Sequence, residues 1–222
     1  MYSIDFHVHS NYSADSIMKV EKMIKIARKI GLSGIAITDH NTVIGGLKGA
    51  KLNRHQDFHV VCGSEIDSEE GHIIGLFLNE EIQTNHAFEI VDEIKEQGGI
   101  SVLAHPFKHK EVINKELLSR IDCIEVFNSR LSQHKNLRAH LLTKELNCPV
   151  LAGSDAHFYC EIGNSMVMID EDISDTEELK KAILNRNVKI CGKLTPFPSN
   201  AFSRFALVFR THVSGRLVTK LL

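Results

Sequence analysis

The sequence predicts a single α/β domain made of repeated βα units around a buried parallel sheet. Short apolar runs rich in β-branched residues alternate along the chain with amphipathic stretches of helical period. Polar, histidine-rich motifs follow several of the apolar runs, at the edge of the sheet where α/β proteins assemble their sites. A chain of 222 residues is long enough for one well-filled core. We therefore expect one domain with its site at the carboxyl ends of the strands.

Nine apolar segments have the length and composition of strands. In chain order they are Ser3–His7, Gly34–Thr38, His59–Cys62, His72–Leu78, Ile100–Ala104, Cys123–Phe127, Val150–Ala152, Met166–Ile169 and Val188–Cys191. The polar stretch that separates Glu65 from His72 ends in Gly71, which is typical of a turn between two paired strands. The sequence thus predicts a hairpin inserted into the βα rhythm.

Helices are predicted between the strands. From Val20 to Ile30 the apolar residues recur at i, i+3 and i+4 spacing, and Gly31 follows as a C-terminal stop. Similar patterns predict helices over Ala87–Gln97, Gln133–Leu146 and Thr176–Asn185.

Composition excludes several classes of protein. The net charge is −2 with acids and bases mixed, which gives no electrostatic case for a nucleic-acid or membrane-surface protein. The chain has no apolar run of 18 residues and begins with a strand-like segment rather than a signal peptide, so we expect a cytoplasmic protein. The five cysteines are an odd number without a Cys-x-x-Cys pair, which predicts buried free thiols rather than disulfides.

The end of the chain, residues 199–222, differs in composition from the rest. It carries Arg204, Arg210, Arg216 and Lys220 among apolar residues and contains no acid. Three interpretations stay open: a final helix that packs on the domain, a dimer contact, or a basic strip facing nucleic acid. An apolar stripe with scattered charges usually faces a core, which favours the first.

Two triplets carry the strongest chemical signal. His7-Val8-His9 lies near the start of the chain, and Asp155-Ala156-His157 lies at the end of a late strand. Side chains at i and i+2 of an extended segment project to the same face, so each triplet directs two metal-binding groups the same way. Two such pairs predict one shared metal site.

Further candidate ligands lie at the same edge of the predicted sheet or in the loops and hairpin beside it. Together with the triplets, the predicted ligand set is His7, His9, Asp15, His40, Glu65, His72, His105, Asp155 and His157. Nine groups are too many for one ion with four to six ligands, so two or three ions bridged by a carboxylate fit better. Pro106 is expected to hold the residue before it extended. The other histidines are interpreted as hydrogen-bonded or surface residues: His55, His59, His86, His109, His134, His140 and His212.

Four polar residues near the predicted strand ends could support such a site. Asp39 could orient a ligand imidazole or could cap its loop, and Glu125 could orient a ligand or close a strand-end hydrogen bond. Asn128 and Arg130 follow the same strand as Glu125 and could bind a phosphate, because arginine offers a planar fork for two oxygens. A plain surface loop is the alternative interpretation of that pair.

The order of these motifs resembles that of the PHP family, the polymerase and histidinol phosphatase group of metal-dependent phosphoesterases. The matching stretches are DFHVHSNYSAD, ITDHNT, GSEI, GHIIGL, LAHP, IEVFN and GSDAH, over residues 5–157. The resemblance implies a distorted (β/α)7 TIM-like barrel, here over residues 1–198, with a cluster of two to three divalent ions at the carboxyl ends of the strands. Zinc, manganese and iron all occur in the family.

The resemblance also implies how the ligands divide among the ions. His7 and His9 would share one ion with Glu65 and Asp155. Glu65 would bridge to a second ion held by His72 and His105. Asp15, His40 and His157 would hold a third.

The expected activity is hydrolysis of phosphate esters, with a small phosphorylated metabolite or nucleotide as substrate and a phosphomonoesterase as the first expectation. Clustered ions would lower the pKa of a water and supply hydroxide near neutral pH, so no nucleophilic side chain is needed. Glu65, Asp155 and His157 are the predicted catalytic residues, with His157 or a water on a metal protonating the leaving oxygen. A nuclease acting on short DNA or RNA, an amide hydrolase and a non-catalytic metal-binding regulatory module are the alternatives.

Overall fold

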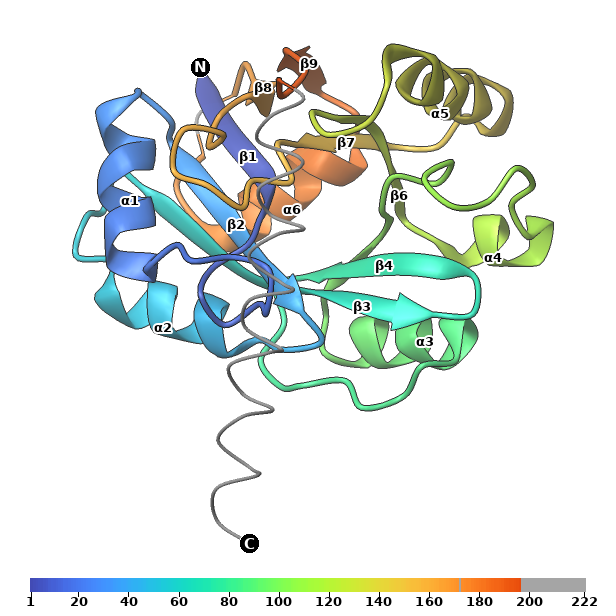
Figure 1. Cartoon of the computed structure of the whole chain (residues 1–222), viewed down its shortest axis with the longest axis horizontal. Coiled ribbons are helices and arrows are strands. Elements are labelled where there is room, and N and C mark those ends of the chain that lie inside the picture. Colours follow the sequence, from blue (N-terminus) through green and yellow to red (C-terminus); the bar gives the residue numbers. More distant parts are fainter. Residues whose placement is uncertain (172, 197–222) are drawn as a thin grey trace, which may run out of the picture.

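The computed structural model describes residues 1–171 and 173–196, which form one mixed sheet covered by helices (Figure 1). The strands are β1 (Tyr2–Val8), β2 (Gly34–His40), β3 (His59–Ser68), β4 (Gly71–Leu76), β5 (Ile100–Leu103), β6 (Cys123–Asn128), β7 (Val150–Gly153), β8 (Ser165–Ile169) and β9 (Val188–Gly192). The helices are α1 (Val20–Lys29), α2 (Ile44–Leu52), α3 (Ala87–Glu96), α4 (Lys115–Arg120), α5 (Gln133–Leu146) and α6 (Thr176–Leu184). The C-terminal segment from residue 199, with its three open interpretations, lies outside the described residues.

The sheet runs in the order β7-β6-β5-β4-β3-β2-β1-β8-β9. β1, β2 and β3 are parallel, as are β5, β6 and β7, whereas β4 is antiparallel to both of its neighbours. The predicted hairpin is therefore present, but β3 continues to Ser68 and the turn is reduced to Glu69 and Glu70. The strand lengthens because Asp67 and Ser68 still pair with His72 and Gly71 on β4.

The two ends of this strand series meet and nearly close the sheet into a barrel. The backbone N–H of Asp155 donates to the carbonyl of His7 at 2.8 Å, and that of His9 donates to the carbonyl of Ala156 at 2.9 Å. A residue with a Cβ at Gly153 would place that atom 2.1 Å from the Cβ of His7, so only glycine allows this approach. At the start of β1, the strand that pairs with Tyr2, Ser3 and Ile4 is β8 rather than β7. The expected distorted seven-stranded barrel is confirmed.

The core has an inner and an outer layer, as strand alternation requires. On β2, Ala36 points into the inner cluster, whereas Ile35 and Ile37 pack outward against α1. On α1 the buried residues are Val20, Met23, Ile24 and Ala27, as the periodicity predicts. Ile30, the last residue of the predicted stripe, is 52% exposed because the helix ends before it and Gly31 turns away with φ +88°.

The sequence pattern does not reveal α2 or α4, and the reason is clearest for α2. Glycines at positions 45, 46 and 49 form the buried face of α2, where an amphipathic helix would carry larger apolar residues. A Cβ at Gly45 would lie 1.9 Å from Oδ2 of Asp39, so the glycines let α2 lie directly against the site's supporting residues. Helix α4 is only 6 residues long, too short for a clear apolar period.

All five cysteines are free, but the expectation that they are buried is wrong for two of them. Cys160 and Cys191 are exposed, Cys62 and Cys148 are half-buried, and Cys123 is buried. Burial, with a smaller contribution from Asp39, raises the pKa of the Cys62 thiol to about 12. Burial likewise raises the pKa of Cys123 well above its usual value.

A thiol reagent at pH 8 should therefore label the native protein in two phases. Cys160 and Cys191 should react rapidly because they are exposed, whereas Cys62 and Cys123 should react only after unfolding. Mass spectrometry of the labelled peptides measures this, and a Cys160→Ser, Cys191→Ser variant should lose the fast phase. Rapid labelling of Cys123 in the native protein would contradict the packing described here.

Candidate metal centre

The predicted ligands converge at the carboxyl end of the barrel. β1, β2, β3 and β4 carry His7, His40, Glu65 and His72 respectively, and the segments that follow β1, β5 and β7 carry His9, Asp15, His105, Asp155 and His157. These residues form overlapping groups in which the ligand atoms all lie within 4.8 Å of one another. None of the seven histidines interpreted as ordinary residues joins a group among the described residues, and His212 lies outside them.

Glu65 stands at the middle of the cluster, between two sets of imidazoles. Its Oε1 lies 2.6 Å from His72 Nδ1 and 2.7 Å from His105 Nε2. Its Oε2 lies 3.2 Å from His9 Nε2, 3.3 Å from His7 Nε2 and 3.4 Å from His40 Nδ1. Each oxygen of one buried carboxylate thus faces its own set of nitrogen ligands, which is the arrangement of a carboxylate that bridges two cations.

The two sequence triplets meet at one point, as their spacing predicts. Oδ1 of Asp155 lies 3.3 Å from Nε2 of His9 and 3.7 Å from Nε2 of His7. The two Nε2 atoms are themselves 3.0 Å apart, and all three side chains are almost completely buried. The barrel closure therefore brings donors from opposite ends of the chain to one centre.

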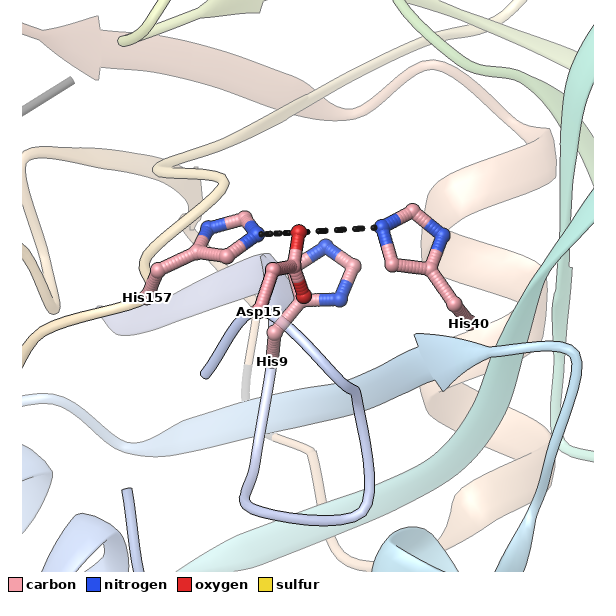
Figure 2. A group of neighbouring side chains, drawn as sticks. All are labelled: His9, Asp15, His40 and His157. Carbon is pink, nitrogen blue, oxygen red and sulfur yellow. Dashed lines mark hydrogen bonds and ion pairs between the residues drawn. The ribbon is translucent and has the colours of Figure 1, made fainter. Parts of the chain in front are cut away.

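A further group lies at the rim of the centre (Figure 2). Oδ2 of Asp15 lies 2.8 Å from His157 Nε2 and 3.6 Å from His40 Nε2, and the ring of His9 stacks between the two imidazoles with centroid distances of 4.4 and 4.6 Å. This group includes His9, which the resemblance assigns to the first ion only. The side chains of His40, Asp15 and His72 are 27%, 22% and 21% exposed, so the centre opens to solvent on this side.

Two ligands need backbone conformations that sequence reasoning did not anticipate. His105 has φ +28°, so the extended conformation expected from the following proline is wrong at this residue. Asp155 has φ +54°. Such conformations cost roughly 1–3 kcal/mol each and persist only where other contacts enforce them. For His105 these contacts are the bond from its N–H to Glu125 Oε2 at 2.8 Å and the contact of its ring with Glu65.

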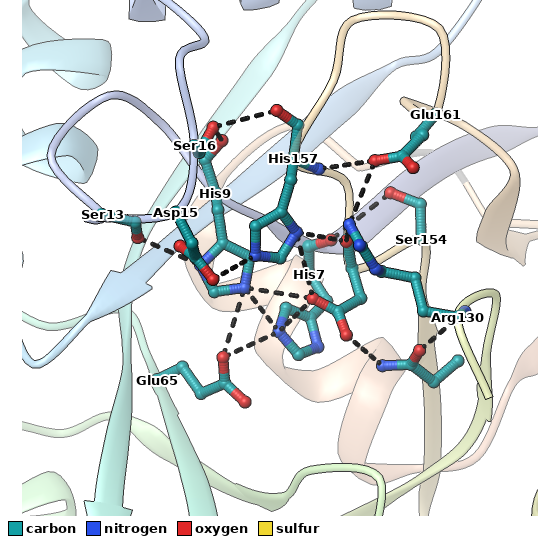
Figure 3. A network of polar contacts seen from close by, with 12 residues as sticks. His7, His9, Ser13, Asp15, Ser16, Glu65, Arg130, Ser154, His157 and Glu161 are labelled. Atoms are coloured by element: carbon teal, nitrogen blue, oxygen red, sulfur yellow. Dashed lines mark hydrogen bonds and ion pairs between the residues drawn. The ribbon is translucent and has the colours of Figure 1, made fainter. Parts of the chain in front are cut away.

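Three ligand imidazoles are oriented from behind so that Nε2 faces the centre (Figure 3). Nδ1 of His7 donates to Glu125 Oε1 at 2.9 Å, and Nδ1 of His157 donates to the carbonyl of Asp155 at 2.8 Å. Nδ1 of His9 donates to Ser13 Oγ at 3.1 Å, because that hydroxyl gives its own proton to a carboxylate. Hydrogen bonds of this kind fix the tautomer that presents the Nε2 lone pair to a metal.

Asp39 serves both roles considered for it, and it does so through serines. Its Oδ1 accepts from the N–H of Ser10 at 2.6 Å and from the hydroxyl of Ser13 at 3.0 Å, while Oδ2 accepts from the hydroxyl of Ser10 at 2.6 Å. Asp39 thereby holds the loop after β1, and through Ser13 it orients His9. Glu125, which contacts His7 and His105, orients ligands directly.

The two residues predicted to bind phosphate are largely occupied by protein contacts. The amide of Asn128 donates to Glu125 at 3.1 Å and to Asp155 Oδ2 at 3.3 Å, and its side chain is completely buried. Arg130 pairs with Glu161 at 3.3 Å and donates to the carbonyl of Asp155 at 3.4 Å. Phosphate binding by either residue stays a prediction, and the contacts observed are those of residues that position Asp155.

Three charged residues near the centre were missed by sequence reasoning. A carboxylate oxygen of Asp67 lies 3.3 Å from Nε2 of His72. The sequence could have indicated this residue, because Asp67 follows Glu65 at i+2 on β3 and so shares its face. Glu161 accepts from the N–H of His157 at 2.7 Å and so holds the loop that carries this ligand. The ammonium of Lys108 lies 3.9 Å from Asp155 Oδ2, and nothing in the basic stretch around Lys108 distinguishes it from Lys110.

The electrostatics of the cluster demand positive charge. Burial opposes protonation of His9, but hydrogen bonds with Asp155 and Glu65 outweigh it and raise its pKa to about 9. For His7, burial is outweighed by Glu125, Glu65 and Asp155, so its pKa lies well above the usual value. Burial also opposes ionisation of Glu65, yet His7 and His40 hold its pKa well below normal. Without metal, protons on the imidazoles supply the positive charge that compensates the buried carboxylates, as bound cations would.

The donor set fits divalent metal ions. Inward-facing Nε2 atoms and carboxylate oxygens are ligands that zinc, iron and manganese accept. Oδ1 of Asp15 is buried with no hydrogen-bond partner among the described residues, which leaves it available as a further ligand atom. A barrel whose rim gathers such donors has the architecture of a metal-dependent hydrolase.

Comparison with known families agrees with this class. Residues 5–137 match the PHP domain, and residues 133–188 match the adjoining PHP-associated region. The chain therefore belongs to the PHP domain family.

Two uncharacterized proteins of Methanocaldococcus jannaschii are similar in sequence. One is 39% identical over 160 residues, covering 64% of this chain and 92% of that protein. The other is 35% identical over 195 residues, covering 82% of this chain and 77% of that protein. A DNA polymerase III of the PolC type from Streptococcus pneumoniae is 27% identical over 96 residues, or 43% of this chain and 7% of the polymerase.

Solved structures share the fold at low sequence identity. A two-domain protein from Bacteroides vulgatus, described as containing a predicted PHP-like metal-dependent phosphoesterase, superposes with a TM-score of 0.74 at 19% identity. The match covers 86% of this chain and 65% of that one. PsfC from Pseudomonas syringae superposes with a TM-score of 0.67 at 16% identity, covering 96% and 98% of the two chains.

Glu65→Gln should greatly reduce metal content while the barrel stays folded. The amide keeps the shape of the side chain but removes the negative charge that both sets of imidazoles face. Metal analysis and circular dichroism of the purified variant measure this, with His134→Ala on the exposed face of α5 as the matched control. Full metal content in Glu65→Gln would remove Glu65 from the centre.

The metal-free protein should lose stability as the pH rises from about 7 to 9.5. The folded-state pKa of His9, about 9, lies above the ordinary histidine value of 6.5. Its protonation therefore stabilises the fold fully below pH 6.5, and this contribution is lost as the pH rises through 9. In chelator, Tm should fall by on the order of 5 °C over this range.

With metal bound, the same pH rise should leave Tm nearly unchanged, because the ions replace the protons. A metal-free His9→Gln variant should show a smaller pH dependence than the unmodified chain. If Tm of the metal-free protein is flat or rises over the same range, the histidines are not held protonated by their carboxylate neighbours.

Proposed function

We propose that this protein is a metal-dependent hydrolase of phosphate esters that acts as a phosphomonoesterase on a small metabolite or nucleotide. The observation that carries the proposal is Glu65, whose two oxygens face separate sets of imidazoles, an arrangement that would suit two adjacent cations. Membership in the PHP family and the fold shared with PHP-like metal-dependent phosphoesterases support it.

Two to three divalent ions, zinc, manganese or iron, would occupy the groups that share ligand atoms. When bound, such ions supply Lewis acidity at the phosphoryl oxygens and lower the pKa of a water to near neutrality. His7 and His9 with Glu65 and Asp155 would hold the deepest position, and Glu65 with His72 and His105 the neighbouring one. Asp15 with His40 and His157, beside His9, would hold the rim position. Glu65 and Asp155 would set the charge of the centre.

The role of His157 follows from its hydrogen bonds. Its Nδ1–H donates to the Asp155 carbonyl, so on the neutral ring Nε2 and Asp15 Oδ2 are two acceptors 2.8 Å apart, a pair that a shared cation would satisfy. Burial and the neighbouring His9 lower the pKa of His157, which also favours the neutral ring. In this state His157 suits cation binding, and donation of a proton to the leaving oxygen would require a second proton on the ring.

The open side of the centre, formed by Asp15, His40 and His72, is where a substrate phosphate would enter. No observation on the described residues favours the nuclease or the non-catalytic regulatory module.

No helix in the described part of the chain has the length and apolar character needed to span a bilayer. The cytoplasmic location stays a prediction.

Protein purified without chelator should hydrolyse p-nitrophenyl phosphate and nucleoside monophosphates, and chelation should abolish the activity until metal is restored. Bis(p-nitrophenyl) phosphate and short oligonucleotides should react at least about tenfold more slowly, equivalent to about 1.4 kcal/mol in transition-state stabilisation. Release of phosphate and of nitrophenol measures the rates. Faster cleavage of oligonucleotides than of any monoester would replace the phosphomonoesterase with the nuclease.

A further inference from the structure

Lys108 lies beside the metal centre with its ammonium free of hydrogen bonds to the described residues. The loop after β5 fixes its backbone, because its N–H donates to the carbonyl of His105 at 2.9 Å and its carbonyl accepts from Lys135 Nζ at 2.8 Å. The ammonium lies 3.9 Å from Oδ2 of Asp155, beyond hydrogen-bond distance, and the side chain is 32% exposed. Its three N–H donors therefore face solvent or a ligand.

The other cations near the centre are already paired within the protein. Arg130 contacts Glu161 and the Asp155 carbonyl, and its side chain is only 11% exposed. Lys110 forms an ion pair with Glu70 at 2.6 Å. Lys108 thus differs from both, because its ion pair with Asp155 is long, at 3.9 Å, and its ammonium has no hydrogen bond to the described residues.

The carboxylate of Asp155 links Lys108 to the ligand cluster. Oδ1 faces Nε2 of His9 and His7, whereas Oδ2 faces the amide of Asn128 and the Lys108 ammonium. A small pocket beside the centre is lined by Lys108 together with the predicted ligands His72 and His105. An anion that enters at His72 and His105 would therefore meet the Lys108 ammonium.

We propose that Lys108 binds a terminal oxygen of the substrate phosphate and makes the site selective for dianionic monoesters. The inference rests on the proposed function and names the residue that decides between monoester and diester. An ammonium is a compact charge with three donors, which suits a terminal phosphate. Its attraction to a dianion is about twice that to a monoanionic diester at equal distance.

The decisive variants are Lys108→Gln and Lys108→Arg, with Lys115→Gln at an exposed position of α4 as the matched control. For Lys108→Gln, kcat/KM on p-nitrophenyl phosphate should fall about 10- to 100-fold, the loss expected for one charge-assisted hydrogen bond. On bis(p-nitrophenyl) phosphate, where the attraction is about half as strong, the loss should be only about three- to tenfold. Lys108→Arg should recover part of the monoester activity, and Lys115→Gln should change it less than about twofold.

Binding of inorganic phosphate to the metal-loaded protein gives a readout that needs no turnover. By calorimetry, Kd for phosphate should rise about tenfold in Lys108→Gln, corresponding to about 1.4 kcal/mol, with metal content unchanged. Unchanged phosphate affinity in this variant, an equal loss on monoester and diester, or loss of bound metal would each overturn the inference.

The proposed function can fail separately. If the unmodified protein hydrolyses no phosphate ester but its phosphate affinity still depends on Lys108, the anion site stands and the phosphomonoesterase does not. If monoesters are hydrolysed equally well by Lys108→Gln and the unmodified protein, the enzyme stands and Lys108 is excluded from its site.

Discussion

The approach of β7 to β1 is the constraint on which the site depends. The backbone bonds between Asp155 and His7, and between His9 and Ala156, join segments nearly 150 residues apart and bring the two triplets together. Gly153 permits this approach because no Cβ fits between the strands. Without it, the histidines near the start of the chain and the carboxylate near its end could not face one cation.

Once the barrel is closed, charge balance dictates the rest of the centre. Glu65 and Asp155 are buried, and an isolated carboxylate in such surroundings would be protonated. The imidazoles around them keep both carboxylates ionised. The carboxylates in turn raise the pKa of His7 and His9. Divalent cations would neutralise the buried carboxylates better than protons do, because each cation brings two charges and binds both carboxylate oxygens and imidazole nitrogens.

The centre is also asymmetric, with a deep side and an open side. His7, His9 and Glu65 are buried and fixed by supporting groups such as Glu125 and Ser13. The rim residues retain partial exposure, and Lys108, in a long ion pair with Asp155, adds a positive charge beside the centre. Under the proposed function, the deep side would hold the cations and the rim would admit the substrate phosphate. This division agrees with hydrolysis of a small phosphorylated substrate.

The sequence by itself determined the α/β class, the strand order along the chain and the nine candidate ligands, because these depend on local period and spacing. It did not reveal α2, whose buried face is glycine rather than an apolar stripe. Nor did it reveal the positive φ of His105, which a contact with Glu125 on another strand enforces. The division of Asp155 between the ligand imidazoles and Lys108 likewise arises only when distant segments meet. Tertiary structure alone decided these features, because each depends on a partner that is remote in the sequence.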